Sequence, residues 1–368
     1  MNILITGSNG FIAKNLKIKL LESRYNNLLF ANKKTKKSTL ISYIEKSDFI
    51  FHLAGINRTP DKKDFFNINF KLTKFICDQL LNYNKKTPIL FTSTSHINKN
   101  TPYAKSKKKA ETCLINFAKK NKSNVCIYRL PNVYGKWAKP NYNSVISTFC
   151  YNIANDKPIN IFDSNEDISL VHIDSVIDNF INKLKYIKQN KYFFQVKPVY
   201  KKKIKLVAKY IQSFNDERSL KNTIIIDNEF KKTLYGTFCS YLPKNKFSYL
   251  LKENIDQRGV FTEVFKNHGG QISYFTAFPK IIRGEHYHHT KVEKFLVLEG
   301  NAIFYFKNIL TNEVKSIKSS GLKPKVVYSI PGWVHSIENT GNTKMIVSLW
   351  SSEIFNAEKP DTISHRIK

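Results

Sequence analysis

The sequence contains few cysteines, and none is placed as a disulfide framework or a zinc ribbon requires. There are five, an odd number, and no two form a Cys-x-x-Cys pair: Cys77, Cys113, Cys126, Cys150 and Cys239. Each lies singly in an apolar or helical stretch, which is typical of small buried side chains in a reducing compartment. This usage argues against a disulfide-stabilised secreted domain and favours a cytoplasmic protein.

Long apolar runs are also missing. No run of about twenty apolar residues occurs, which is the length that a membrane-spanning helix needs. The first residues, Met1–Gly7, lack the charged region and the long apolar region of a signal peptide. We therefore expect no membrane insertion and no secretory leader.

Acidic residues are scarce relative to basic ones. The 60 Lys+Arg against 28 Asp+Glu give a formal net charge of +32, which ordinarily suggests nucleic acid or an anionic membrane as a partner. The lysines are spread along the chain in short clusters such as 107–109 and 201–203, and no familiar nucleic-acid-binding module accompanies them. We interpret them as solvated side chains that also help to attract phosphorylated ligands, and we expect no nucleic-acid partner.

Two domains are the natural expectation for a chain of 368 residues. The pattern of apolar and polar residues differs between two parts of the sequence, which agrees with that expectation. From residue 1 to about 195, short apolar runs alternate with longer amphipathic segments. This alternation predicts a Rossmann-type, doubly wound α/β sheet with buried parallel strands. The expected strands are Ile3–Ile5, Asn27–Phe30, Phe49–Leu53, Ile89–Phe91 and Val125–Tyr128.

After Phe247 the hydrophobic pattern changes to that of short strands with alternating apolar and polar residues, separated by Gly, Asn and Pro turns. This pattern predicts an all-β antiparallel barrel. We place the linker at Tyr241–Lys246, after a segment from residue 200 that looks helical and then irregular. The expected domains are residues 1–245 and 246–368. The expected strands of the second are Gln271–Phe275, Lys294–Leu298, Ala302–Phe306, Val326–Ile330 and Met345–Leu349.

A glycine pattern opens the first domain. Gly7-x-x-Gly10-x-x-Ala13 follows the first strand directly and begins a helix, where free backbone N–H groups and the helix dipole can hold a pyrophosphate. The glycines permit a tight turn and close approach of the backbone, and Ala13 keeps the helix near the strand. The residues expected to bind the cofactor here are Gly7, Ser8, Asn9, Gly10, Phe11 and Ile12.

The end of the second strand indicates which nicotinamide cofactor is bound. NAD enzymes carry an acid about twenty residues after the glycines, which binds the ribose hydroxyls. Here the strand ends Ala31-Asn32-Lys33-Lys34, with two cations and no acid. Lys33 or Lys34 can pair with a 2′-phosphate, so we expect NADPH; lysines of a generally basic surface are the alternative.

Four further motifs follow in order: Leu53-Ala54-Gly55, Thr92-Ser93-Thr94, Tyr103-x-x-x-Lys107, and Pro131-Asn132 after Arg129-Leu130. The Tyr-x-x-x-Lys spacing puts both side chains on one helix face. In this order the motifs resemble the extended short-chain dehydrogenase/reductase family, which includes nucleotide-sugar epimerases and dehydratases.

The resemblance implies roles for these residues. Tyr103 is the acid, Lys107 holds the nicotinamide ribose and lowers the tyrosine pKa, and Thr94 or its neighbour Ser93 hydrogen-bonds the substrate carbonyl. Leu53, Ala54, Gly55, Pro131 and Asn132 contact the cofactor. The sequence departs from the family in the short gap from Thr94 to Tyr103, and a short segment leaves little room for the third strand of the family sheet. We expect His52 and His172 to be core residues, and Asn69, His96 and Asn98 to be structural or solvated more readily than pocket residues.

Two histidine-and-acid clusters mark the second domain. They are His286-x-His288-x4-Glu293-x6-Gly300 and His335-x3-Asn339, the two-part metal signature of a cupin barrel. Alternate residues of a strand face the same way, so His286 and His288 can both point inward. The expected ligands are His286, His288, Glu293 and His335, which suit Zn²⁺, Fe²⁺ or Mn²⁺. His289 competes with His288 if a bulge shifts the register, and a barrel without metal is the alternative.

The stretches Asp256–Glu263 and Ile282–His286 resemble cupin deoxysugar 3-epimerases and 3,5-epimerases. There a base removes a proton next to a ketone, and the enolate oxygen needs a positive partner, for which a bound metal or Lys294 is expected. We also expect His288 to take part in this catalysis as base or ligand.

Beyond these motifs, the segments Gly135–Cys150 and His288–Val297 match the bifunctional capsular polysaccharide enzymes of the UDP-N-acetyl-L-fucosamine pathway. The resemblance covers the whole chain and implies C3 epimerisation of a UDP-2-acetamido-2,6-dideoxy-4-hexulose in the cupin, C4 reduction by NADPH to the L-talose form, a zinc ion and a homodimer. The alternatives are a cupin that is a 3,4-ketoisomerase or only a dimerisation barrel, and a nucleotide-sensing or nucleic-acid-binding regulator.

Overall fold

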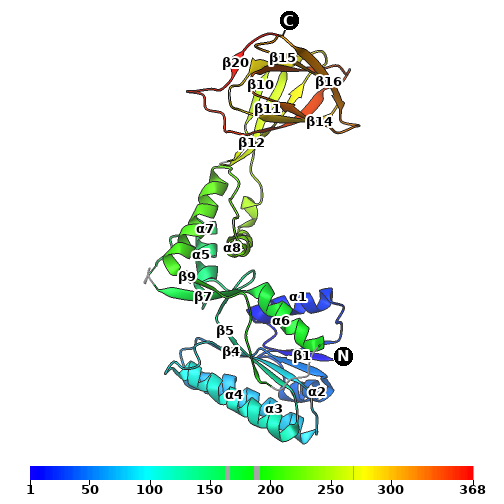
Figure 1. Ribbon diagram of the computed structural model, residues 1–368. Helices are drawn as coiled ribbons and strands as arrows, with labels where there is room; N and C mark the ends of the chain where they lie inside the picture. The colour runs from blue at the N-terminus through cyan, green and yellow to red at the C-terminus, as the bar shows by residue number, and fades with distance from the viewer. Residues whose placement is uncertain (162–165, 186–190, 268, 368) are drawn as a thin grey trace. The chain divides into compact units, whose positions relative to one another are not determined.

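The computed structural model describes residues 1–161, 166–185, 191–267 and 269–367. The chain forms two compact units, shown with their elements in Figure 1. The first comprises Met1–Ser213 and Asp227–Pro243, and the second comprises Phe214–Ile226 and Lys244–Lys368. The segment Phe214–Ile226 thus belongs to the second unit, although it precedes the expected boundary at residue 245. It is hydrogen-bonded to the barrel, since the Thr223 N–H donates to the Lys266 carbonyl at 2.7 Å.

The first unit is built on a six-stranded sheet in the order β2-β1-β3-β4-β5-β8, with every neighbouring pair parallel. Its strands are β1 (Ile3–Thr6), β2 (Leu28–Ala31), β3 (Phe49–His52), β4 (Ile89–Thr94), β5 (Val125–Leu130) and β8 (Phe193–Phe194). All five expected strands are present. Within the described ranges β2 is an edge strand, and the short segment between β2 and β3 forms only the helix α2 (Lys37–Lys46).

The remaining elements of the first unit are mainly helices. They are α1 (Phe11–Glu22), the π-helix η1 (Phe65–Lys71), α3 (Leu72–Asn82), α4 (Pro102–Asn121), α5 (Val145–Ala154), α6 (Ile173–Lys185) and α8 (Glu229–Cys239), with α7 (Ile204–Ser219) ending in the second unit. A small sheet, β6-β7-β9, joins β6 (Asn132–Tyr134), β7 (Asp167–His172) and β9 (Tyr200–Lys203). No helix in the described part of the chain is long and apolar enough to cross a membrane.

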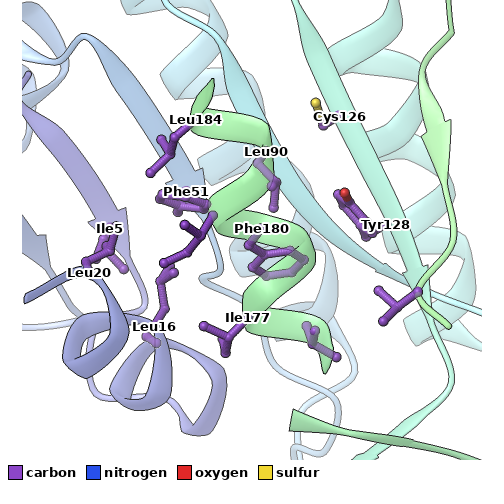
Figure 2. Packing of buried hydrophobic residues seen from close by; sticks show 14 of the residues in the cluster. Ile5, Leu16, Leu20, Phe51, Leu90, Cys126, Tyr128, Ile177, Phe180 and Leu184 are labelled. Atoms are coloured by element: carbon purple, nitrogen blue, oxygen red, sulfur yellow. The ribbon is translucent and has the colours of Figure 1, made fainter. Parts of the chain in front are cut away.

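Both faces of the parallel sheet are buried, which explains why its strands are continuous apolar runs. Ile3 and Ile5 face one core with α1 and α6, whereas Leu4 faces the other with α3 and α4. Figure 2 shows the first of these cores, where Phe180 of α6 lies between Phe51 and Tyr128 of the sheet. The carboxyl ends of the strands are thereby held at one edge, where the polar motifs begin.

The second unit is a barrel of two antiparallel sheets, as the alternating pattern predicted. One sheet has the order β10-β11-β12-β19-β14-β17 and the other has the order β16-β15-β18-β13-β20. The strands are β10 (Glu253–Asp256), β11 (Gly259–Asn267), β12 (Gly270–Ala277), β13 (Ile282–Tyr287), β14 (Glu293–Glu299), β15 (Asn301–Asn308), β16 (Val314–Ser320), β17 (Val326–Ser329), β18 (Trp333–Asn339), β19 (Met345–Ser351) and β20 (Ile363–Ser364), after the 3₁₀ turn η2 (Lys244–Lys246).

The turn after β1 requires glycine. Gly7 has φ +67°, and a Cβ built on it would lie 2.7 Å from both N and Cα of Ala54. These are backbone atoms, so they cannot move aside as a flexible side chain would. Gly236 in α8 is the opposite case, because a Cβ built there meets nothing within 4 Å.

We predict opposite effects on stability for two glycine substitutions in the same unit. Gly7→Ala should lower the free energy of unfolding by about 1–3 kcal/mol through backbone strain and steric clash. Gly236→Ala should raise it by about 0.5–1 kcal/mol, because alanine favours a helix interior. Thermal and urea unfolding measure both. Equal effects of the two substitutions would contradict this account of the turn.

Candidate active site and candidate metal centre

Helix α4 carries the Tyr-x-x-x-Lys pair at its start. The Thr101 hydroxyl caps this helix by accepting from the Ala104 N–H at 3.2 Å, and Pro102 occupies the first turn, where its missing N–H costs nothing. Tyr103 and Lys107 then lie one turn apart, next to the carboxyl end of β4. The cap thus fixes the first residue of α4, and with it the positions of Tyr103 and Lys107 relative to Thr94.

Lys107 is a buried ammonium group. Its Nζ donates to the Thr92 carbonyl at 2.8 Å and lies 4.4 Å from the centroid of the Phe91 ring. Burial lowers the pKa of Lys107 to about 8, and Glu111, one turn further along α4, acts in the opposite direction. Well below pH 8 the side chain therefore carries a positive charge, at a fixed position beside the end of the sheet.

Tyr103 pairs with Thr94. Burial raises the pKa of Tyr103, and a hydrogen bond with Thr94 partly offsets that rise. The expectation that Lys107 lowers this pKa is not met in the chain alone, because burial and Thr94, and not Lys107, set the shift. The phenol therefore stays protonated and can donate. Ser93, the alternative to Thr94, has its hydroxyl buried with no hydrogen-bond partner among the described residues.

The residues around Gly7 form a cradle that fits a nucleotide pyrophosphate. Gly10 is the N-cap of α1, and no side chain of the described residues caps this helix, so its first N–H groups remain available. Ser8 N–H donates to the Ala31 carbonyl at 3.1 Å, which ties the turn to β2. A Cβ on Gly55 would lie 3.2 Å from the Nζ of Lys107, so the cradle and the lysine adjoin.

A buried hydrogen-bond relay, not foreseen from the sequence, supports this cradle. The Ala54 N–H donates to the Thr6 hydroxyl at 3.2 Å, and that hydroxyl bonds to His52 Nδ1 at 2.7 Å. The other ring nitrogen of His52 bonds to the Thr73 hydroxyl at 2.9 Å, which itself donates to the Asn69 carbonyl at 2.8 Å. Burial, and then Lys107, lower the pKa of His52 to about 3, so it is a neutral core histidine as expected.

The other expected cofactor residues lie at the surface near the same edge. Lys33 and Lys34 are exposed in the turn after β2, where the Asn32 side chain accepts from the Lys34 N–H at 2.9 Å. Asn132 begins β6, next to Pro131, and its amide donates to the Ser169 carbonyl at 3.3 Å. Asn69 is buried and bonded to the backbone of Ile56, so its role is structural.

In the second unit, four side chains converge as one candidate metal centre. Ligand atoms of His286, His288, Glu293 and His335 all lie within 4.8 Å of one another. A bulge helps to bring them together: β13 shifts register between Gly284 and His286, so that His286 pairs directly with His335 of β18. The bulge precedes the two histidines, and it is His288, not His289, that faces the cluster; His289 is exposed.

The hydrogen bonds around the cluster leave its inner atoms free for a metal. Glu293 Oε2 lies 3.3 Å from His288 Nε2 and 3.2 Å from His335 Nε2, while the opposite nitrogen of His335 bonds to the Ser329 hydroxyl at 2.8 Å. His288 Nε2 is buried without a hydrogen-bond partner in the described structure. Three imidazoles, one carboxylate and an unsatisfied inward nitrogen fit Zn²⁺ or a similar divalent ion.

The electrostatics of the cluster favour the protonation states in which Glu293 and His286 can bind a metal. Burial tends to raise the pKa of Glu293, but the close approach of His288 and His335 holds that pKa far below its usual range. Burial, followed by repulsion from His335, lowers the pKa of His286 to about 4. The carboxylate is therefore charged and His286 is neutral near pH 7.

Lys294 does not lie in this site. Its Nζ is 4.8 Å from the Trp350 ring and 5.1 Å from the Tyr328 ring, on the face of β14 opposite to Glu293. Successive residues of a strand point to opposite faces, so Glu293 and Lys294 cannot both face the cavity. Lys291, which precedes β14, takes the expected place, with its Nζ 3.4 Å from Glu293 Oε1.

The candidate metal centre opens into a cavity of about 330 Å³ inside the barrel. Phe275, Phe295 and Phe304 supply apolar walls. Arg258, Arg283 and Lys291 supply positive charge, and the buried Nε of Arg283 has no partner among the described residues. The cavity thus suits an anionic ligand with an apolar face.

Comparison with known proteins finds a separate family match for each part of the chain. Residues 3–192 match the NAD dependent epimerase/dehydratase family, and residues 254–363 match the polysaccharide biosynthesis C-terminal domain. The chain is 40% identical over 364 residues to the UDP-2-acetamido-2,6-beta-L-arabino-hexul-4-ose reductase of Pseudomonas aeruginosa, and the match covers 98% of each chain.

Solved structures give the same result. The capsular polysaccharide assembling protein CapF from Staphylococcus aureus covers 100% of both chains with a TM-score of 0.92 and 38% identity. The UDP-glucose 4-epimerase of Thermotoga maritima, at 18% identity and a TM-score of 0.55 over 66% of this chain and 98% of its own, shares the fold. The chain therefore belongs to the NAD dependent epimerase/dehydratase family, in the two-domain branch that carries a polysaccharide biosynthesis C-terminal domain.

Proposed function

We propose that the chain is a bifunctional nucleotide-sugar enzyme. Its first unit reduces the C4 ketone of a UDP-2-acetamido-2,6-dideoxy-4-hexulose with NADPH, and its second unit, a cupin, epimerises C3 of the same sugar. The product is the UDP-linked L-talose form, a precursor for capsule or O-antigen synthesis. The observation that carries the proposal is the set of Thr94 at the end of β4 and Tyr103 and Lys107 at the start of α4, in a chain that matches a hexul-4-ose reductase over 98% of its length.

In the reductase unit the chain supplies a proton and fixed charge. The nicotinamide, when bound, supplies the hydride that C4 accepts. Tyr103 is protonated because burial raises its pKa, so it can donate its proton to the C4 oxygen while Thr94 hydrogen-bonds the same oxygen. The ammonium group of Lys107 adjoins the cradle at Gly55, where it can hold the nicotinamide ribose.

In the cupin unit, epimerisation requires loss of the C3 proton and its return to the opposite face. His286, His288, Glu293 and His335 would hold a divalent metal, with zinc the ion we expect, and that metal would supply Lewis acidity at this site. Lys291 lines the cavity and adds a second positive charge for the enolate oxygen, the role first expected of Lys294. His288 Nδ1 is hydrogen-bonded to the Asp361 carbonyl and Nε2 points toward Glu293 in the cluster, so we assign His288 to ligation and not to proton removal.

We also propose a homodimer that uses the outer face of the barrel. β17 is an edge strand of its sheet, and its outward Val326 and Tyr328 are 54% and 50% exposed. Leu298 of the neighbouring β14 is 53% exposed. Large apolar side chains gathered at a sheet edge favour a contact with a second copy.

We predict that NADPH is preferred over NADH because two lysines, and no carboxylate, follow β2. Lys33→Gln with Lys34→Gln should weaken NADPH binding roughly 10-fold or more and leave NADH binding within about twofold, since only NADPH carries the 2′-phosphate. Titration of the intrinsic fluorescence measures both affinities. Lys119→Gln with Lys120→Gln, at the exposed end of α4, is the control with the same charge change. Equal losses for the two cofactors would refute the assignment.

The function itself is tested by product analysis. The protein is incubated with the UDP-4-keto sugar and NADPH, and the product is identified by NMR. We expect NADPH consumption and a sugar inverted at C3 and reduced at C4. Tyr103→Phe should lower NADPH consumption by about 10²-fold or more, because the proton donor is lost. A 3-keto product would instead indicate a ketoisomerase, and reduction without inversion at C3 would indicate a structural barrel.

A further inference from the structure

The last residues of the chain lie across the metal-binding strand. β20 pairs with β13, with Ser364 opposite His286 and Ile363 opposite Tyr287. The His365 N–H then donates to the Glu285 carbonyl at 2.9 Å. This C-terminal segment, residues 360–365, is therefore held against the strand that carries the first ligand, and its contacts continue onto the loop that follows.

Asp361 of the C-terminal segment binds this loop through its carboxylate. One oxygen accepts from the His289 N–H at 2.8 Å, and the other accepts from the N–H groups of Thr290 and Lys291 at 2.8 and 2.9 Å. The Thr290 hydroxyl adds a fourth bond at 3.0 Å. Three consecutive N–H groups of the chain between His288 and Glu293 thus converge on one side chain seventy or more positions away.

The backbone of the same segment fixes His288 itself. The Asp361 carbonyl is hydrogen-bonded to His288 Nδ1, which must be the protonated nitrogen because a carbonyl only accepts. The proton on Nδ1 leaves the lone pair on Nε2, the buried atom that faces Glu293 at 3.3 Å. The segment therefore selects the tautomer of His288 that can bind a metal.

A third contact concerns Lys291. The hydroxyl of Thr362 accepts from Lys291 Nζ at 3.2 Å, and that Nζ is 3.4 Å from Glu293 Oε1. The C-terminal segment thus acts on His288 directly and on Glu293 through Lys291. The other two candidate ligands, His286 and His335, lie opposite each other on β13 and β18, outside this loop.

We propose that Asp361 is a positioning residue of the metal centre: its carboxylate holds the loop from His289 to Lys291, so that His288 presents Nε2 and Lys291 faces Glu293. The proposal rests on the proposed metal site. Loss of such an outer partner typically weakens metal binding 10- to 100-fold while the ligands themselves remain.

The test measures metal affinity, without any assay of activity. Full-length wild type, Asp361→Ala and Asp361→Asn are stripped of metal and titrated with Zn²⁺ against a competing chelator. The control is Glu358→Gln, an exposed acid in the same region of the chain. We expect the dissociation constant to rise 10- to 100-fold in Asp361→Ala, to rise less in Asp361→Asn, which keeps one acceptor oxygen, and to stay within about twofold of wild type in the control.

Two further measurements distinguish a role of Asp361 in positioning the ligands from a role in protein stability alone. Thermal unfolding of the metal-free proteins measures the structural cost of each change, and the absorption spectrum of the Co²⁺-loaded proteins measures ligand geometry. An altered Co²⁺ spectrum in Asp361→Ala supports positioning, whereas wild-type affinity and spectrum with a lowered melting temperature overturn it. If Asp361→Ala does not fold, wild-type affinity of Asp361→Asn overturns the proposal. If wild type binds no metal, the proposed metal site fails, and this inference fails with it.

Discussion

Both candidate sites depend on charges that the fold keeps out of water. Such a charge is tolerated only where opposite charges or hydrogen-bond partners surround it, so its neighbours are strongly constrained. In the first unit the charge is the ammonium of Lys107, bonded to the Thr92 carbonyl. In the second it is the carboxylate of Glu293, which lies between two imidazoles and Lys291. Much of the local structure at each site follows from these needs.

The two sites are built from different backbone geometries. In the parallel sheet, the strands are apolar on both faces and their carboxyl ends lie at one edge. The candidate site residues lie at or just after those ends, as do Thr94 and Gly7. In the antiparallel barrel, the candidate ligands lie on β13, just after it, on β14 and on β18, and a bulge before His286 places it opposite His335. A parallel sheet therefore assembles its site from loops and a helix start, whereas the barrel assembles its site in its interior.

Periodicity and motif order predicted most of the fold and the convergence of the four side chains of the candidate metal centre, because those features depend on local pattern. The choice of Lys294 was wrong for a reason that the same pattern contains: if Glu293 points inward, its neighbour points outward. Lys291 and Asp361 could not be found in this way, because a loop has no periodicity and their contact spans seventy residues. The direction of the Tyr103 pKa shift also required the structure, since it is set by burial of the phenol.

The central claim is that the two units perform separate steps on one sugar. Solvent deuterium incorporation at C3 of the UDP-4-keto sugar, followed by NMR in D₂O, tests it most directly. Correctly folded Tyr103→Phe should incorporate deuterium at C3 at the wild-type rate, although it no longer consumes NADPH. His288→Asn should lose the incorporation and keep at most reduction of the unepimerised ketone. Loss of exchange in Tyr103→Phe, or normal exchange in His288→Asn, would contradict the division of labour.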